Sequence, residues 1–158
     1  MAIYLKYGSI PGAVTTAGFE KWIELSSFQW SASRAIGTAA RGSTSREHSE
    51  PHLSEVTVTK YMDVGSPKLF LDSVAGKLDN LVTIKFSTVQ KGSVETFLTF
   101  VFENTGVSEY SMSSGGDMPM ESLCFNYTKM SATFTGLDPS LSGSPETVGY
   151  DLTIMKTT

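Results

Sequence analysis

Apolar side chains recur at every second position along most of this chain, which is the periodicity of β-strands. Val82, Ile84 and Phe86 alternate with polar residues, and the glycine at 92 predicts a tight hairpin turn directly after them. Because strands and helices do not alternate, the pattern predicts an antiparallel β-barrel or sandwich of seven or eight strands. Strands are expected at 3–7, 22–30, 52–61, 80–89, 94–103, 121–135 and 148–155.

One segment interrupts this alternation with a short helix, predicted at 66–75. Ser66 is expected to cap it, since a serine side chain can accept a hydrogen bond from a free amide of the first turn. Pro67 suits the first helical position, and Gly76 is expected to end the helix in a left-handed conformation. The apolar side of the helix is predicted to consist of Leu69, Phe70 and Val74.

The segment 94–103 is apolar on both faces, and such a strand should be covered on both. The core is one cover, and the helix or a neighbouring copy of the chain is expected to be the other. Phe97 and Val101 are therefore candidate subunit-interface residues, on the face opposite Leu98, Phe100 and Phe102.

The 158 residues are expected to form a single domain, 1–158, long enough to bury a core without covalent staples. A net charge of −4 argues against a general nucleic-acid binder, which needs a basic surface. Cys124 is the single cysteine, so no disulfide within the chain is expected. With neither a signal peptide nor a long apolar stretch recognised, synthesis in the cytoplasm without membrane insertion is expected.

Motifs of catalysis are scarce. The sequence contains no P-loop, dinucleotide-binding glycine pattern or Gly-x-Ser-x-Gly elbow. His48, Glu50 and His52 form a His-x-Glu-x-His pattern, but in an extended chain the two histidines lie about 13 Å apart, so solvated polar residues are the favoured interpretation. Cys124 is expected to be a buried structural thiol. We therefore predict no enzyme activity, no metal site and no cofactor.

Several segments, taken in order, resemble the Hcp family, the tail-tube proteins of bacterial type VI secretion. The most specific is 58–69, in which Lys60, Asp63 and the Ser66-Pro67 helix start stand in the family's register. Loops at 37–51 and 139–145 depart from several members in charge or length. The other similar segments are 3–8, 23–30, 94–108, 121–127 and 149–152.

This resemblance implies a phage tail-tube-like fold and a homo-hexameric ring that stacks into a tube inside a contractile sheath, with a spike protein at its tip. It also implies that effector proteins bind in the ring lumen, and that the tube is secreted to the extracellular space or into a target cell. The expected ring-stacking residues are Arg41, Arg46, Glu47 and Glu50, in a loop long enough to reach the next ring. The expected lumen-facing residues are Ser111, Ser113, Ser114 and Asp117.

Two other interpretations stay open. The first is the tube protein of a phage-like contractile tail, which has a related fold and would be separated by its neighbouring genes. The second is a monomeric β-barrel binding module or small hydrolase, which would need a concave pocket with convergent polar groups. The scarcity of histidine argues against the second interpretation.

Overall fold

The computed structural model describes residues 1–37, 49–136 and 145–158, and its paired strands all run antiparallel. The mainly β, antiparallel fold predicted from the sequence is confirmed, and α1 (Ser66–Ala75) is the one helix of these ranges. The strands are β1 (Ala2–Tyr7), β2 (Ile23–Leu25), β3 (Ser27–Gln29), β4 (Ala32–Ser33), β5 (His52–Leu53), β6 (Val56–Tyr61), β7 (Asn80–Gln90), β8 (Ser93–Ser113), β9 (Met120–Asn126), β10 (Lys129–Phe134), β11 (Glu146–Asp151) and β12 (Lys156–Thr157).

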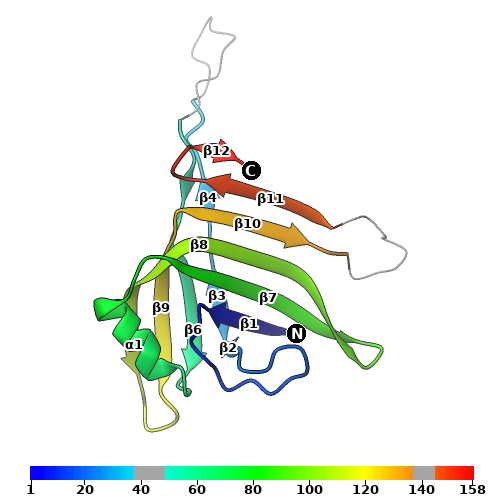
Figure 1. The fold of residues 1–158 in the computed structure, drawn as a ribbon, viewed down its shortest axis with the longest axis vertical. Helices are drawn as coiled ribbons and strands as arrows, with labels where there is room; N and C mark the ends of the chain where they lie inside the picture. The colour runs from blue at the N-terminus through cyan, green and yellow to red at the C-terminus, as the bar shows by residue number, and fades with distance from the viewer. Residues whose placement is uncertain (38–48, 137–144) are drawn as a thin grey trace, which may run out of the picture.

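The long strand β8 joins two halves of the sheet (Figure 1). In one half the order is β12-β11-β10-β8-β7-β1-β2, and in the other β8 continues into β9, β6 and β3. Asn104 has a positive φ of 51°, and a bulge between Val107 and Glu109 shifts the register with β9. These irregularities let one strand serve both halves, because bulges bend a strand and increase its twist. The predicted strand 94–103 is therefore only the first half of β8.

The hairpin between β7 and β8 forms as predicted. Gln90 pairs with Ser93, and the two residues between them, Lys91 and Gly92, have φ of 48° and 82°. Two consecutive positive φ values match the right-handed twist of the flanking strands. The turn fixes the register in which Ile84 stands opposite Phe100.

The core lies between the two halves and follows the predicted alternation. On one side Leu5, Ile84 and Phe100 stand side by side on neighbouring strands, and Phe28 of β3 stacks on Phe100 with ring centroids 5.0 Å apart. Each fully buried Leu, Ile, Val or Phe side chain contributes about 1.5–3 kcal/mol. The buried cluster comprises Leu5, Tyr7, Ile23, Leu25, Val56, Val58, Leu69, Val82, Ile84, Phe100, Phe102, Val107, Leu123, Phe125, Tyr127 and Met130.

Helix α1 has the predicted bounds, but its ends differ from the prediction. Gly65 is the N-cap and no side chain caps the helix; the hydroxyl of Ser66 instead accepts hydrogen bonds from the Asp63 amide and from Lys60. Gly76 is extended, with φ of −73°, and its amide donates to the carbonyl of Asp72. The predicted left-handed ending is therefore wrong, because one backbone hydrogen bond already closes the last turn.

The predicted apolar side of α1 is confirmed for Leu69 alone. Leu69 is fully buried in the core, whereas Phe70 and Val74 are 53% and 66% exposed. The helix thus presents much of its apolar surface to solvent in the single chain.

Four predicted strands are interrupted. Residues 52–61 divide into β5 and β6, 22–30 divide into β2 and β3, and 121–135 divide into β9 and β10. The fourth predicted strand, 148–155, is paired only as far as Asp151, the end of β11. The chain then turns back through 152–155 into β12. Each break moves the chain from one ladder to another, which alternation of side chains alone does not reveal.

The flanks of the predicted loop at 37–51 form an arm that leaves the sheet. Strands β4 and β5 pair with each other, and beyond them the amide of Ser49 donates to the carbonyl of Ala35. The middle of that loop and most of the 139–145 connection lie outside the described residues.

Candidate functional site

The outer face of β3, β6, β9 and the second half of β8 carries rows of small polar side chains. Directly opposite residues of a sheet share a face, and Ser27, Thr59, Ser122 and Ser111 stand opposite one another in that order. We call this surface the hydroxyl face. Its members are Ser27, Gln29, Thr57, Thr59, Tyr61, Glu109, Ser111, Ser113, Met120, Ser122 and Cys124.

The hydroxyl face exists because polar residues alternate with the core. In β6, the half-buried Thr57 and Thr59 flank the fully buried Val58, and β9 repeats this pattern around Leu123. The hydroxyls of Ser27 and Thr59 are 2.6 Å apart, so part of the row is hydrogen-bonded within the sheet. With Glu109 as its single charged member, this surface can donate and accept hydrogen bonds while few ions need desolvation.

Two of the four predicted lumen residues lie on this face. The sequence predicts an irregular polar loop at 110–117, but Ser111 and Ser113 belong to β8, because β8 keeps pairing with β9 as far as Ser113. Ser114 and Asp117 lie in the following turn, where the Ser114 hydroxyl donates to the Asp117 carbonyl at 2.8 Å. All four side chains are exposed.

The sequence-based prediction missed the partners of these serines on β3, β6 and β9. The signal was present in the alternation of 56–61 and 121–125, whose polar positions necessarily share one face. Cys124 is among them: it is half-buried on the hydroxyl face and lies 3.5 Å from the hydroxyl of Thr57. The expected buried position of this thiol is therefore wrong, since its neighbours Leu123 and Phe125 occupy the core side.

Of the predicted stacking residues, Glu50 alone falls within the described ranges. It is exposed on the arm, next to β5. Arg41, Arg46 and Glu47 lie outside the described residues. At its root the arm is tied to the sheet by Tyr127, whose hydroxyl donates to the carbonyl of Ser54 at 2.8 Å.

The two predicted interface residues differ in setting. Val101 is half-buried opposite Thr83 and Ser131, on the face away from the core. Phe97 occupies an irregularity in the ladder, and its ring centroid lies 6.3 Å from that of Phe86. Phe97 is the extra residue of β8 at this point, without a partner in β7, so the alternation of faces along β8 does not decide which side of the sheet its side chain occupies. Large exposed apolar side chains occur elsewhere, on and after α1 and on β10 and β11: Phe70, Leu71, Val74, Leu78, Phe134 and Val148.

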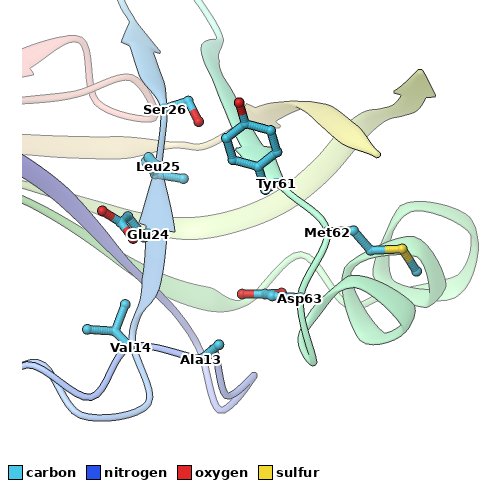
Figure 2. A pocket seen from close by; sticks show the side chains of 8 residues that line it. All are labelled: Ala13, Val14, Glu24, Leu25, Ser26, Tyr61, Met62 and Asp63. Carbon is cyan, nitrogen blue, oxygen red and sulfur yellow. The ribbon is translucent and has the colours of Figure 1, made fainter. Parts of the chain in front are cut away.

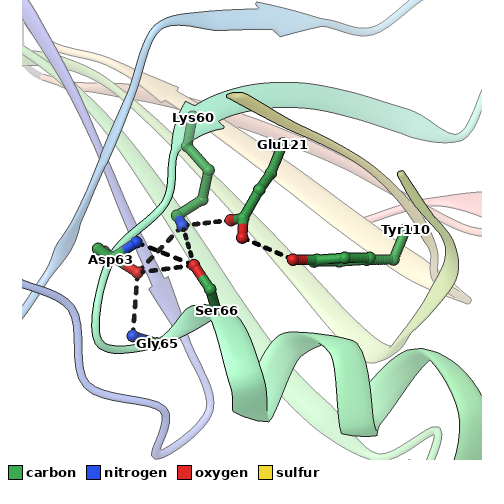
Figure 3. A network of polar contacts seen from close by, with 6 residues as sticks. All are labelled: Lys60, Asp63, Gly65, Ser66, Tyr110 and Glu121. Atoms are coloured by element: carbon green, nitrogen blue, oxygen red, sulfur yellow. Dashed lines mark hydrogen bonds and ion pairs between the residues drawn. The ribbon is translucent and has the colours of Figure 1, made fainter. Parts of the chain in front are cut away.

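Beneath the hydroxyl face lies a buried polar network (Figure 3). Lys60 of β6 and Glu121 of β9 stand directly opposite each other, are both fully buried, and form an ion pair of 2.6 Å. Lys60 also donates to the Ser66 hydroxyl at 3.0 Å and pairs with Asp63 at 3.0 Å. On the other side of Glu121, the hydroxyl of Tyr110 donates to Oε1 at 2.6 Å.

The network changes the acidity of its members. Burial alone would raise the pKa of Glu121, but hydrogen bonds from Lys60 and Tyr110, helped by the nearby Ser66 hydroxyl and the charge of Lys60, outweigh it and leave this pKa below its ordinary value. Burial, followed by the hydrogen bond to Glu121, raises the pKa of Tyr110. Glu121 is thus held as a carboxylate and Tyr110 as a neutral donor.

Alternation also contained a signal for this network. Lys60 follows Val56 and Val58 at core-facing positions, and Glu121 precedes Leu123 and Phe125 in the same way. Two opposite charges at core positions of separate strands indicate a buried pair, since an unpaired buried charge is very costly.

A hollow of about 360 Å³ lies between β2, the segment 13–14 and the end of β6 (Figure 2). Glu24 and Asp63 both line it, but Asp63 is already bound to Lys60 and to the Gly65 amide. Within the described ranges, no group of three or more His, Cys, Asp or Glu side chains could hold a metal ion. His48 of the His-x-Glu-x-His pattern lies outside those ranges.

The comparisons with known proteins identify the family. The family model described as "Type VI secretion system effector, Hcp" matches residues 4–134 of the 158. The chain belongs to the Hcp family. Hcp proteins are structural tube components of type VI secretion, so the resemblance seen in the sequence is confirmed.

Solved structures share the fold over nearly the whole chain. One described as a type six secretion system protein is 28% identical, with a TM-score of 0.89 and 99% of both chains covered. Hcp1 from Salmonella typhimurium is 21% identical, with a TM-score of 0.75 over 99% of this chain and 98% of that one. A cap protein of the anti-feeding prophage is 8% identical, with a TM-score of 0.58 over 84% and 88%, which shows a shared fold alone. No curated protein matches the chain in sequence.

No helix within the described ranges is long and apolar enough to cross a membrane.

Proposed function

We propose that this Hcp protein forms hexameric rings that stack into the tube of a type VI secretion system, with the hydroxyl face lining the lumen. The observation that carries the lumen assignment is the row of Ser27, Thr59, Ser122 and Ser111 across four adjacent strands. It lies on an outer face of half-buried and exposed polar side chains. A surface of this kind lets proteins of varied sequence bind and slide past, because it offers hydrogen bonds with little charge.

Effector proteins are the proposed occupants of this lumen. Ser111 and Ser113 contact them directly, while Ser114 and Asp117 lie at the rim formed by the turn between β8 and β9. Tyr61 and Met120, which stand opposite each other on the same face, add apolar contacts, since thioethers adapt to partners of varied shape.

The ring closes through head-to-tail contacts between apolar surfaces. Each copy has exposed apolar side chains on α1 and others on β10 and β11, so two distinct patches of one chain are available for a heterologous contact. Such a contact gives a closed ring when its rotation closes. We also propose Phe97 and Val101 of β8 as interface residues; Val101 lies on the opposite face of the sheet from Phe134 and Val148, so it would meet a different part of the neighbouring copy.

The arm forms the contact between successive rings. Glu50, with Arg41, Arg46 and Glu47 farther along the loop, supplies charges of both signs, which set register and specificity more than affinity. The spike protein caps the tube, the contractile sheath surrounds it, and secretion delivers it to the outside of the cell or into a target cell.

A neutralised arm tests the stacking proposal. Replacing Arg41, Arg46, Glu47 and Glu50 together with serine should leave rings intact and abolish tubes in electron micrographs. Tubes that form as in the parent protein would exclude these charges from stacking. Particles with no ring at all, in the parent protein, would overturn the proposed assembly itself.

A contractile phage-like tail is the second candidate. The shared fold with the anti-feeding prophage cap supports it at the level of architecture, whereas the family match and the 28% identity to a type six secretion protein favour type VI secretion. Genes for a type VI membrane complex beside this one would decide between the two.

A further inference from the structure

The buried network occupies the layer between the hydroxyl face and α1. Lys60, Glu121 and Tyr110 each alternate along their strand with residues of the hydroxyl face, and Ser66 is the first residue of α1. Figure 3 shows the side chains of Lys60 and Glu121 converging above the start of the helix. The network therefore joins the sheet to the helix at one point.

Each proton of the Lys60 ammonium has its own acceptor. A lysine has three donors, and here they meet Glu121 of β9 at 2.6 Å, Ser66 of α1 at 3.0 Å and Asp63 of the connection at 3.0 Å. The three acceptors lie on three different segments. One buried cation consequently fixes the positions of a strand, a turn and a helix start relative to one another.

Stability alone does not explain this arrangement. A buried ion pair is often no more stabilising than apolar side chains of similar volume, because both charges lose their hydration. The neighbouring core positions of the same two strands, Val58 and Leu123, are apolar. The hydrogen bonds that Lys60 donates differ from such packing in that they are directional, so they fix orientation.

Apart from the burial of Leu69 in the core, the start of α1 has few other side-chain constraints. No side chain caps it, and its first turn contains no acidic residue. Ser66 is held by Lys60 and by the amide of Asp63 at 2.9 Å. From that start, the helix exposes Phe70, Leu71 and Val74, the last two by 60% and 66%.

We infer that Lys60 and Glu121 are positioning residues for assembly: they hold α1 in the orientation that presents Phe70, Leu71 and Val74 to the next copy of the chain. This inference rests on the proposed ring. The occupant of the helix surface is a second copy, because the same chain carries a second exposed apolar surface on β10 and β11, with Phe134 and Val148 each more than half exposed.

The test separates helix positioning from ring formation. Leu71→Asp places a charge on the helix surface without touching the network, and should yield soluble single chains by light scattering. In that background, Lys60→Met, Tyr110→Phe and Glu121→Met together replace the network with apolar side chains. We expect cooperative unfolding at a temperature no lower than that of Leu71→Asp alone, with amide exchange in α1 faster by about tenfold.

Glu103→Gln is the matched control, since its pair with Lys129 is a 3.4 Å contact between partly exposed side chains. Ser66→Ala keeps the Lys60–Glu121 pair and removes the hydrogen-bond acceptor on the helix, so it should also accelerate amide exchange in α1. If the triple variant does not fold, Ser66→Ala provides the test alone. Exchange in α1 at the rate of the control in both variants would overturn the inference, as would intact rings in Leu71→Asp. Single chains in the unmodified protein would instead overturn the proposed ring.

Discussion

The indole nitrogen of Trp30 donates a hydrogen bond of 2.7 Å to the hydroxyl of Tyr127, 97 positions farther along the chain. The hydroxyl of Tyr127 in turn donates a hydrogen bond to the carbonyl of Ser54. Trp30 and Ser54 lie on the two sides of the arm where it leaves the sheet. The two hydrogen bonds therefore connect both sides to Tyr127, in the segment between β9 and β10. In this way they hold both sides of the arm at its base.

Replacing Trp30 with Phe should loosen the arm while the sheet stays folded. The variant loses one part-buried hydrogen bond, and a hydrogen bond typically stabilises by about 1 kcal/mol. We expect faster hydrogen exchange at 31–36 and 49–54, with exchange in β7 and β8 unchanged. Equal protection of the arm amides in Trp30→Phe and in the parent protein would show that the Trp30–Tyr127 hydrogen bond does not hold the base of the arm.

Tyr7→Phe should weaken the attachment of α1 and change the alkaline stability. The fully buried Tyr7 donates to Asp72 of the helix at 2.6 Å, and a hydrogen bond to a charged group contributes about 1.5–3 kcal/mol. Burial, then Asp72, raises the pKa of Tyr7, so its contribution is present below the unfolded pKa of about 10 and lost as pH rises above it. Urea unfolding between pH 7 and 11 should give a flatter profile for Tyr7→Phe, and parallel profiles would contradict the assignment.

Glu121→Gln should make the free energy of unfolding less dependent on pH in the acid range. Because the folded-state pKa of Glu121 is lowered, its stabilisation is complete above the unfolded pKa of about 4.3 and is lost as pH falls through the folded value. At pH 7 the variant should lose about 3–5 kcal/mol, the usual result of breaking a buried pair. Unfolding free energies from pH 7 to 3 measure this loss, with Glu103→Gln as the exposed control expected to change by about 0–1 kcal/mol.

Ser113→Gln should reduce effector retention without disturbing rings. The exposed Ser113 stands opposite Met120 at the end of the hydroxyl face, where a longer side chain narrows the proposed lumen. Co-purification of an effector with rings of each variant provides the measurement. Ser93→Gln, an exposed change at the β7–β8 hairpin, is the control, and equal retention in both variants would remove Ser113 from the effector surface.

Local rules predicted the fold class but not its long-range connections. The helix bounds and the 91–93 turn follow from residues adjacent in sequence, and both were confirmed. The continuation of β8 beyond Glu103 depends on pairing with β9 and on a positive φ at Asn104. Neither the pairing of β8 with β9 nor this positive φ can be predicted from residues adjacent in sequence.

The candidate site was predictable in part. Ser111 and Ser113 were predicted through the family resemblance, whereas placing Thr59 and Ser122 beside Ser111 required the register between β6, β9 and β8. The pairing of Lys60 with Glu121 also needs that register, because 61 positions separate them. Alternation identified which residues face inward, and only the sheet order shows which of them meet.

The mass of the purified protein in solution tests the proposed assembly most directly. Light scattering behind size exclusion should give a species of about six times the 17.1 kDa chain, as expected for a closed heterologous ring. Leu71→Asp should shift that mass to the single chain. A parent protein that elutes as a 17.1 kDa monomer at every concentration would contradict the account, leaving the fold intact and the ring unsupported.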